Sequence, residues 1–455
     1  MSGPAALGYL TGAPTRVELD FPGVLGGCKD EGMHAEPPQS PKSSQSPKSS
    51  QALTPSQSSQ TSQPQRDLAS RRSEVAPFHV MDVLALAQER QRTHGDALFL
   101  CVGQPATAAP AAAIARARAD LENQVLGYTA AVGTPELRET IAAWHRENYG
   151  TATEAADVVI TTGSSGGFVA LFLAVLDVGD DIVLARPGYP AYRNTLQALG
   201  ANIVEIDCGP ETRFQLTAQH LQALPRVPKA VIVTSPDNPT GTIIDADELR
   251  AIAKWCEQHD CLLISDEIYH GITYGRKCAS AREFSDAAVV VGSVSKYFSM
   301  TGWRVGWLIV PKWLRAPLDR LEANLTVCPP AISQAAAVEA FSAESIAELN
   351  SHVTRYARNR DVLLEGLPRV GLGNIAPPDG GFYIYANIAG LYDDPNSVDS
   401  MTWARELLAA TGVAVAPGID FDTENGHEWV RFCFAGETSE MEEAVRRIGV
   451  FIGRG

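Results

Sequence analysis

The stretch AAVVVGSVSKYFSMTGWRVGW at positions 287–307 joins a short apolar run to a segment rich in glycine and serine. Continuous apolar runs of this kind are typical of strands that are buried on both faces of a sheet. The runs KAVIVT at 229–234 and CLLI at 261–264 have the same character, and a crossover helix is expected between them at Asp247–Gln258. This alternation predicts an α/β fold with a mainly parallel sheet.

Further elements are expected on either side of these strands. They are strands at Asp157–Thr161, Asp181–Leu184, Gly381–Tyr385 and Trp429–Phe434, and helices at Val80–Arg92 and from the Gly-rich stretch 163–167 onward. The part after about residue 331 mixes a long helix, two strands and a final helix. This change of pattern indicates a smaller α+β lobe.

The N-terminal part of the chain has a different composition. Residues 39–65 are almost entirely Ser, Gln, Pro and Lys, and the hexapeptide SPKSSQ occurs twice in tandem, at Ser40–Gln45 and Ser46–Gln51. Such a segment cannot bury enough apolar surface to offset the entropy of ordering it. Residues 1–74 are therefore expected to form a disordered tail.

The overall charge limits the classes of partner. With Lys+Arg 37 and Asp+Glu 53, the net charge is −16, which gives no general attraction for nucleic acids or anionic membranes. The longest apolar run, Phe168–Leu176, is far shorter than the ~20 residues that cross a bilayer. The N-terminus lacks the basic start of a secretory signal, and the eight cysteines form no CxxC pair. We expect a reduced, cytoplasmic protein with no metal site.

Polar segments follow each of the three buried strands. SPDNPTG at 235–241, SDEIYHG at 265–271 and the segment from Gly292 onward stand where strands end. Ligands of open parallel sheets bind at the carboxyl ends of the strands. These segments are therefore the expected site.

Lys296 and Arg304 carry the charges of the third segment. A lysine at the end of a buried strand is poorly hydrated, which lowers the pKa of its amine and favours the neutral, nucleophilic form. This is the property that a Schiff-base lysine needs. Arg304 stands in the apolar sequence GWRVGW and needs an anion, for which a phosphate is the natural choice, with Ser293 and Ser295 as further donors.

Together these segments resemble the class I and II aminotransferases, which are pyridoxal-phosphate (PLP) enzymes of fold type I. The family's lysine motif S-x-S-K-x₇-R-x-G is matched at 293–306, and its NPTG and D-x-x-Y motifs are matched at 238–241 and 266–269. Three further segments match as well: GYTAAVGTPELRE (127–139), PGYPAY (187–192) and VRFCFA (430–435). The resemblance covers about residues 75–455, and the motifs occur in the family's order.

The resemblance implies a mainly parallel seven-stranded sheet in a large domain, with a smaller α+β domain beside it. We accordingly expect four parts of the chain. They are the Ser/Gln/Pro-rich tail (1–74), the N-terminal segment of the small domain with a linker (75–120), the large PLP-binding domain (121–330) and the C-terminal small domain (331–455).

The resemblance also implies roles for individual residues around the cofactor ring. Lys296 would be the Schiff-base lysine, and Asp266 would face the pyridine nitrogen and keep it protonated. Tyr269 and Asn238 would hydrogen-bond the phenolic oxygen of the ring, and Tyr189 would stack on the ring. Lys296, Asp266 and Tyr269 are the predicted catalytic residues.

Other residues are expected to hold the phosphate and the substrate. The expected phosphate ligands are Ser164, Ser165 and Gly166 at a helix start, Ser293, Ser295, Arg304, and Tyr128, which would serve the site of a neighbouring subunit. The substrate carboxylate would be bound by Arg431 and Asn238, with Gly103 in a segment that closes over it. The resemblance therefore implies a homodimer with shared active sites.

The predicted function is a ping-pong transfer of an amino group between an L-amino acid and a 2-oxo acid. A PLP-dependent carbon–sulfur β-lyase is an alternative on the same fold. A PLP-fold regulatory protein is a second alternative, although residues 1–74 show no helix-turn-helix pattern. Gly166 stands where one branch of the family has a lysine for a side-chain carboxylate, so a neutral or broad range of amino donors is expected, with 2-oxoglutarate or pyruvate as acceptor.

Overall fold

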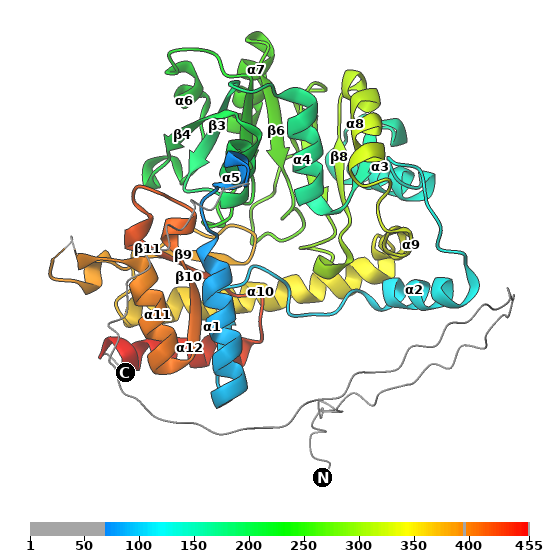
Figure 1. Cartoon of the computed structure of the whole chain (residues 1–455). Coiled ribbons are helices and arrows are strands. Elements are labelled where there is room, and N and C mark those ends of the chain that lie inside the picture. Colours follow the sequence, from blue (N-terminus) through cyan, green and yellow to red (C-terminus); the bar gives the residue numbers. More distant parts are fainter. Residues whose placement is uncertain (1–68, 395–396, 454–455) are drawn as a thin grey trace, which may run out of the picture. The chain divides into compact units, whose positions relative to one another are not determined.

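The computed structural model describes residues 69–394 and 397–453, and its larger sheet has seven strands in the order β2-β8-β7-β6-β5-β3-β4 (Figure 1). Strand β8 is antiparallel to β2 and β7, and the other neighbouring strands are parallel. The strands are β2 (Val158–Thr161), β3 (Asp181–Arg186), β4 (Asn202–Asp207), β5 (Ala230–Thr234), β6 (Leu262–Asp266), β7 (Val289–Ser293) and β8 (Gly306–Ile309). The predicted α/β fold with a mainly parallel seven-stranded sheet is confirmed.

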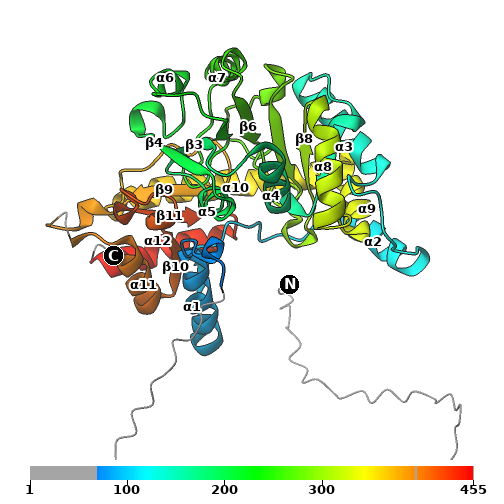
Figure 2. The same ribbon diagram turned by 45° about the horizontal axis from the view of Figure 1, so that its top comes forward.

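Both faces of this sheet are buried, as the continuous apolar runs predicted. Val159 of β2 packs in one hydrophobic cluster, whereas Val158 and Ile160 belong to the cluster on the opposite face. Helices α4 (Gly163–Val175), α5 (Pro190–Leu199) and α8 (Lys312–Leu325) cover the first face, as Figure 2 shows. On the second face, α3 (Pro135–Tyr149) packs against β2 and α7 (Ala246–Gln258) against β6, whereas α9 (Ala331–Ala340) packs on α3 and α2 (Ala111–Asn123) on α9.

A second sheet has four strands in the order β1-β10-β11-β9. They are β1 (Leu98–Leu100), β10 (Val413–Pro417), β11 (Trp429–Cys433) and β9 (Tyr383–Asn387). Strand β1 pairs parallel to β10, and the remaining pairs are antiparallel. Because β1 comes from the beginning of the described chain and the other strands from its end, distant parts of the sequence meet in this sheet.

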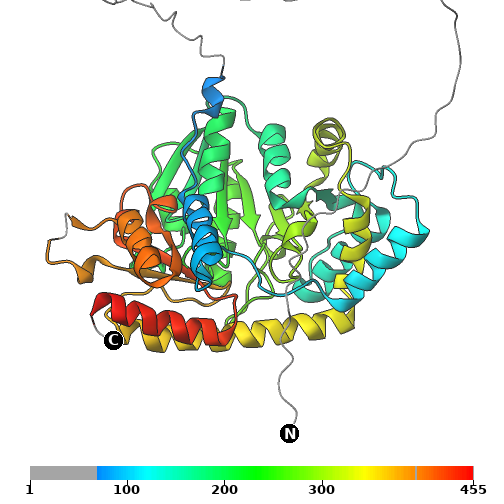
Figure 3. The same ribbon diagram turned by 60° about the horizontal axis from the view of Figure 1, so that its bottom comes forward.

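Helices pack around the smaller sheet. They are α1 (His79–His94), α10 (Ala343–Arg369), α11 (Ser400–Thr411) and α12 (Thr438–Ile452), whereas the short α6 (Ala218–Gln222) contacts α7. Figure 3 shows α12 lying beside the long helix α10, where Val445 packs against Gly366. All described residues belong to one compact unit.

The predicted strands have counterparts in the structure, but strands β1, β4, β8 and β10 have none among the predictions. Strand β4, NIVEID, lies at the edge of the sheet and is only partly buried, so it lacks a continuous apolar run. Strand β8, GWLI, begins two residues after Arg304, inside the segment interpreted as a site. Residues 1–68 of the predicted tail lie outside the described part of the chain. Within that part, no helix is long and apolar enough to cross a membrane.

Candidate active site

The segments that follow β5, β6 and β7 meet at one cavity of about 250 Å³. Asn238 follows β5, Asp266 ends β6 and Lys296 follows β7. Tyr383 of β9 and Arg431 of β11 also line the cavity, so that both sheets contribute to it. The cavity therefore lies at the carboxyl ends of the parallel strands, where the sequence predicted a site.

Most of the predicted site residues line this cavity. They are Gly103, Ser164, Ser165, Tyr189, Asn238, Asp266, Tyr269, Ser295, Lys296, Arg304 and Arg431. Gly166, Ser293 and Tyr128 are not among the lining residues. The Ser293 hydroxyl lies behind Ser295, where it donates to the Val305 carbonyl at 2.9 Å and accepts from the Ser295 N–H at 3.1 Å.

Tyr128 lies away from this cavity. Its side chain is 88 % exposed, and it borders a second, open cavity of about 680 Å³ together with Leu126 and Thr162. It therefore makes no contact with the cavity of its own chain. Gly166 lies inside α4, and the side chain of Thr162 is its near neighbour.

Lys296 has a desolvated amine, and no carboxylate of the described residues lies at hydrogen-bond distance from it. Its Nζ donates to the carbonyl oxygen of Gly103 at 2.6 Å and lies 5.7 Å from the centre of the Tyr269 ring. Burial lowers the pKa of the amine from 10.5 to about 8. A substantial fraction of this amine is therefore neutral near physiological pH and can act as a nucleophile.

Asp266 is a buried carboxylate held by two donors. The Ile268 N–H donates to Oδ1 at 3.1 Å, and the hydroxyl of Tyr192 donates to Oδ2. Burial raises the pKa of Asp266 to about 6, and the bond from Tyr192 opposes that rise. The carboxylate is thus mostly charged at neutral pH. Tyr192, which Thr234 contacts at 3.2 Å, was missed in the sequence although it belongs to the PGYPAY segment.

Tyr269 shares a hydrogen bond with a residue that has no motif. Its hydroxyl lies 2.7 Å from the hydroxyl of Tyr383, and burial raises the pKa of both phenols. A Cβ atom at Gly103 would lie 2.0 Å from the Tyr383 hydroxyl, so this position requires glycine. Tyr383 is therefore a further member of the site that the sequence did not single out.

Arg431 is a buried cation that binds only neutral acceptors within the described residues. Its side chain donates to Asn238 Oδ1 at 2.8 Å and to the Cys101 carbonyl at 2.6 Å, and its Nε has no partner. The rings of Tyr383 and Phe421 lie 4.5 and 4.7 Å from its guanidinium carbon. A buried charge of this kind calls for an anion, and a carboxylate matches the planar guanidinium group.

A second anion site lies at the start of α4. Thr162 makes no capping hydrogen bond, so the first N–H groups of this helix point to the cavity side without a cap. The Arg304 guanidinium lies beside them and donates to the Thr301 carbonyl at 2.9 Å. A Cβ atom at Gly163 would lie 2.2 Å from Arg304 Nη2, which shows how closely the arginine approaches the helix start. A phosphate is suited to this position.

Comparison with known proteins identifies the family. Residues 96–448 match the family model of aminotransferase class I and II. A valine–pyruvate aminotransferase of Mycobacterium tuberculosis is 51 % identical over 388 residues, which cover 85 % of this chain and 99 % of that protein. A (5-formylfuran-3-yl)methyl phosphate transaminase of Methanocaldococcus jannaschii is 32 % identical, over 85 % of this chain and 100 % of its own length.

Solved structures agree with these relatives. An aminotransferase from Mycobacterium tuberculosis superimposes with a TM-score of 0.83 at 51 % identity, covering 86 % of this chain and all of that chain. The aspartate aminotransferase from Thermus thermophilus with maleate gives a TM-score of 0.78 at 32 % identity, covering 84 % of this chain and 99 % of that chain. The fold is therefore that of the aminotransferases.

The residues of the cavity fit the cofactor of this family. PLP carries an aldehyde, a basic ring nitrogen and a phosphate, and the cavity offers a desolvated lysine, a buried carboxylate and the anion site at α4. Arg431 also presents a charge with no carboxylate partner among the described residues of the cavity. The chain therefore belongs to the class I and II aminotransferases and is a PLP-dependent enzyme that transfers amino groups between amino acids and 2-oxo acids.

Proposed function

We propose that the amino donor is an L-amino acid with a neutral aliphatic side chain, and that pyruvate is the acceptor. The observation that carries this proposal is the apolar part of the cavity wall, which is made by Phe78, Val80, Met81, Val102 and Ile268. The name of the valine–pyruvate aminotransferase that is 51 % identical to this chain supports the same substrates. Relatives that are aminotransferases favour transamination over the lyase and regulatory alternatives.

The charges in the cavity also support a neutral donor. Within the described part of the chain, the cations that line the cavity are Lys296, Arg304 and Arg431. In our proposal, each of them already has a role, since Lys296 binds the aldehyde, Arg304 the phosphate and Arg431 the α-carboxylate. No further lining cation of these residues is left for the side-chain carboxylate of aspartate or glutamate, and an unpaired carboxylate is costly to bury.

We further propose how the residues of this chain perform the reaction. Bound PLP would withdraw electrons from the carbon that carries the amino group, which makes the Cα proton acidic. Arg431 and Asn238 would hold the α-carboxylate of the donor. The released amine of Lys296 would accept the proton from the donor's Cα, and the charged Asp266 would keep the ring nitrogen protonated.

A half-reaction tests the choice of donor. The purified holoenzyme is mixed with single amino acids in the absence of any oxo acid, and the visible absorption of the cofactor is followed. We expect bleaching with valine and other aliphatic amino acids, and slower bleaching with aspartate or glutamate. A preference for the dicarboxylic amino acids would contradict the proposed donor, and pyruvate released from a sulfur amino acid would indicate the lyase.

Arg431→Lys is expected to lower kcat/KM for the aliphatic donor by about 10²-fold, mainly through KM. Lysine keeps the charge but cannot form two parallel hydrogen bonds to a carboxylate, and breaking a buried pair costs about 3–5 kcal/mol when a partner is lost outright. Steady-state kinetics with a saturating acceptor measures kcat and KM for the aliphatic donor. An unchanged KM would show that Arg431 does not bind the substrate carboxylate.

Uptake of PLP by the apoenzyme is expected to accelerate as the pH rises through about 8. The neutral amine of Lys296 is the nucleophile, and it predominates above the pKa that burial has lowered to about 8. Stopped-flow absorbance at a series of pH values measures the rate. A midpoint near 10.5, the ordinary pKa of lysine, would contradict the desolvation of this amine.

We propose that the enzyme is a homodimer in which Tyr128 serves the partner's phosphate site. Large apolar side chains that precede it in the sequence are exposed, with Leu121 63 %, Val125 97 % and Leu126 41 % accessible, and exposed apolar surface of this kind marks interaction surfaces. Tyr128→Phe is expected to weaken PLP binding about 10-fold, because a hydrogen bond to a charged group is lost. Titration of PLP and sedimentation analysis test the two parts of this proposal, and a monomeric wild-type enzyme would contradict it.

We also propose that the described chain divides into the parts expected from the sequence, with residues 121–330 carrying the large sheet and residues 75–120 and 331–455 the small one.

We propose a cytoplasmic location because the cysteines within the described residues are unpaired. All of them are free thiols: Cys101, Cys208, Cys256, Cys261, Cys278, Cys328 and Cys433. Reduced thiols suit that compartment.

A further inference from the structure

Helix α1 begins without a cap from its own segment. Its N-cap residue is Phe78, which has no side-chain acceptor for the first N–H groups of the helix. The acceptor comes instead from Asp420, more than 300 residues later in the chain. Its Oδ1 accepts from the His79 N–H at 2.8 Å, and its Oδ2 accepts from the Val80 N–H at 2.7 Å. A carboxylate also suits the positive end of the helix dipole.

This end of α1 forms part of the cavity wall. Phe78, Val80 and Met81 line the cavity, and the Phe78 ring meets the Tyr189 ring edge-on with centroids 6.2 Å apart. Asp420 itself is 2 % exposed and does not line the cavity. Any effect of Asp420 on a substrate must therefore pass through the position of these apolar side chains.

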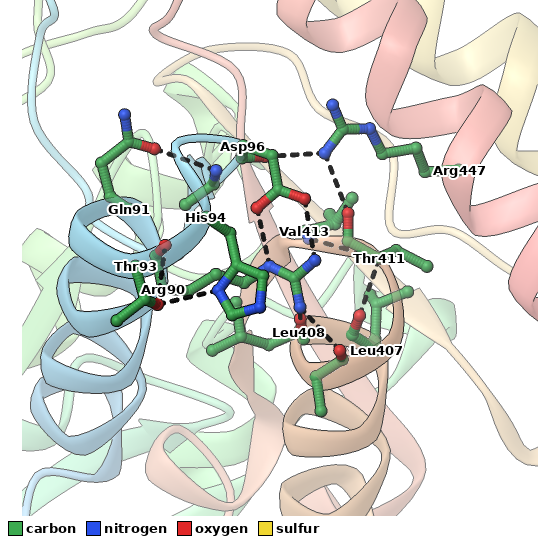
Figure 4. A network of polar contacts seen from close by, with 12 residues as sticks. Arg90, Gln91, Thr93, His94, Asp96, Leu407, Leu408, Thr411, Val413 and Arg447 are labelled. Carbon is green, nitrogen blue, oxygen red and sulfur yellow. Dashed lines mark hydrogen bonds and ion pairs between the residues drawn. The ribbon is translucent and has the colours of Figure 1, made fainter.

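The other end of α1 is fixed independently. Figure 4 shows Arg90 bonded to both carboxylate oxygens of Asp96, each at 2.8 Å, and to the Leu408 carbonyl of α11 at 3.0 Å. Arg447 of α12 donates to the carbonyl oxygens of Asp96 and Thr411 at 2.7 and 2.8 Å. The C-terminal end of α1 is thus tied to α11, whereas its cavity end is held by Asp420 together with the buried side chains of Val80 and Val83.

The segment of Asp420 is itself held against the larger sheet. Arg193 donates to the Asp420 carbonyl at 3.1 Å, and the Gly188 N–H donates to the Phe421 carbonyl at 2.9 Å. The Phe421 ring contacts the guanidinium group of Arg431. Asp420 thus links the apolar wall to the elements that carry the proposed carboxylate-binding arginine.

We infer that Asp420 is a positioning residue that determines the enzyme's discrimination among aliphatic amino donors. By fixing the first turn of α1, it holds Phe78, Val80 and Met81 at the distance that a branched side chain needs for contact. The methyl side chain of alanine offers less apolar surface to this wall and is expected to depend on it less. The inference rests on the proposed preference for neutral aliphatic donors.

The test compares valine with alanine in holoenzyme variants. Asp420→Ala is expected to raise the KM for valine about 10-fold, while the KM for alanine and the kcat for both donors change less than about 3-fold. A single methylene group in a hydrophobic pocket is already worth about 10–200-fold in discrimination, and valine has two more side-chain carbons than alanine. Asp420→Asn retains one acceptor oxygen and is expected to raise the KM for valine only about 3-fold. The valine-to-alanine ratio of kcat/KM is the readout.

Asp399→Ala is the matched control. Asp399 caps α11 by accepting from the Thr402 N–H at 2.7 Å, but it does not line the cavity. This variant is expected to lower the thermal midpoint and leave the ratio unchanged. Equal losses for valine and alanine in the Asp420 variants, or failure of both variants to fold, would overturn the inference and leave Asp420 with a purely structural role.

A substitution in the apolar cavity wall tests whether that wall contacts the side chain of valine. Val80→Ala leaves the Asp420 contacts in place and is expected to lower the same ratio by about 10-fold. An unchanged ratio in Val80→Ala would overturn the inference whatever the Asp420 variants do. A wild-type enzyme that reacts with neither valine nor alanine would instead refute the proposed donor, which distinguishes the two failures.

Discussion

Replacing Lys296 with alanine is expected to lower the rate of amino transfer by on the order of 10⁴-fold or more. The variant loses the nucleophile for the cofactor aldehyde and the base for the Cα proton at the same time. The other lysines of the chain cannot replace it, because Lys296 is the lysine that lines the cavity within the described residues. Steady-state turnover with valine and pyruvate, together with the visible spectrum, measures the loss.

The controls for this variant separate chemistry from folding. Lys254→Ala removes an exposed lysine of α7 and is expected to retain full activity. Lys296→Ala should remain folded, because it removes a desolvated amine rather than a packed core side chain. Activity within 10-fold of the wild type in Lys296→Ala would exclude this lysine as the catalytic base and nucleophile.

Part of the proposed catalytic region could be predicted because each of its residues lies close in sequence to a strand that the apolar pattern reveals. Strands β5, β6 and β7 are continuous apolar runs, and polar motifs at their ends supply Asn238, Asp266 and Lys296. Residues that come at the ends of these strands in the sequence therefore lie together at the carboxyl edge of the sheet. The resemblance to a known family, which the comparisons confirm, added the identity of the cofactor.

The residues that the sequence did not reveal act across long sequence distances. Tyr383 meets Tyr269, Tyr192 meets Asp266, and Asp420 meets the start of α1, over separations of 114, 74 and 340 residues. None of the three stands in a motif interpreted for that role. In the sequence, these tyrosines and this aspartate cannot be distinguished from ordinary core or turn residues. Their contacts form only when distant segments meet in the folded chain.

Ser293 illustrates a different limit of sequence reasoning. The lysine motif groups Ser293 with Ser295, and both were predicted as phosphate ligands. In the structure Ser295 lines the cavity, whereas Ser293 lies behind it and bonds to the Val305 carbonyl at 2.9 Å. Strand β7 ends at Ser293, and Ser295 lies in the turn that follows. Because the backbone leaves the strand between the two residues, the motif alone does not show which hydroxyl faces the ligand.

Asp266→Asn is the second substitution with a large expected effect, a loss of about 10²–10³-fold in kcat. The amide has nearly the same shape but no charge, so it cannot keep a proton on the ring nitrogen. Electron withdrawal from the substrate's Cα depends on that proton. Single-turnover kinetics with valine should show slow bleaching of the cofactor band, while cofactor content stays near that of the wild type.

Glu267→Gln is the matched control for this substitution. Glu267 follows Asp266 directly and is also buried, but it faces Ser265, Ser280 and the Ala281 N–H and does not line the cavity. Its replacement is expected to change thermal stability with little effect on kcat. Equal kinetic losses in both variants would mean that burial of any carboxylate at this strand end matters, rather than the charge opposite the cofactor.

The pH profile of Tyr192→Phe tests how the hydrogen bond from Tyr192 affects the charge of Asp266. The Tyr192 hydroxyl donates to Asp266 and lowers the pKa of that carboxyl, against the burial that raises it to about 6. In Tyr192→Phe the pKa of Asp266 should rise further, and the acid limb of kcat should move to higher pH. Because activity needs the charged carboxylate, the variant should lose most activity near pH 6 and least near pH 8. An acid limb that stays in place would show that Asp266 does not govern it.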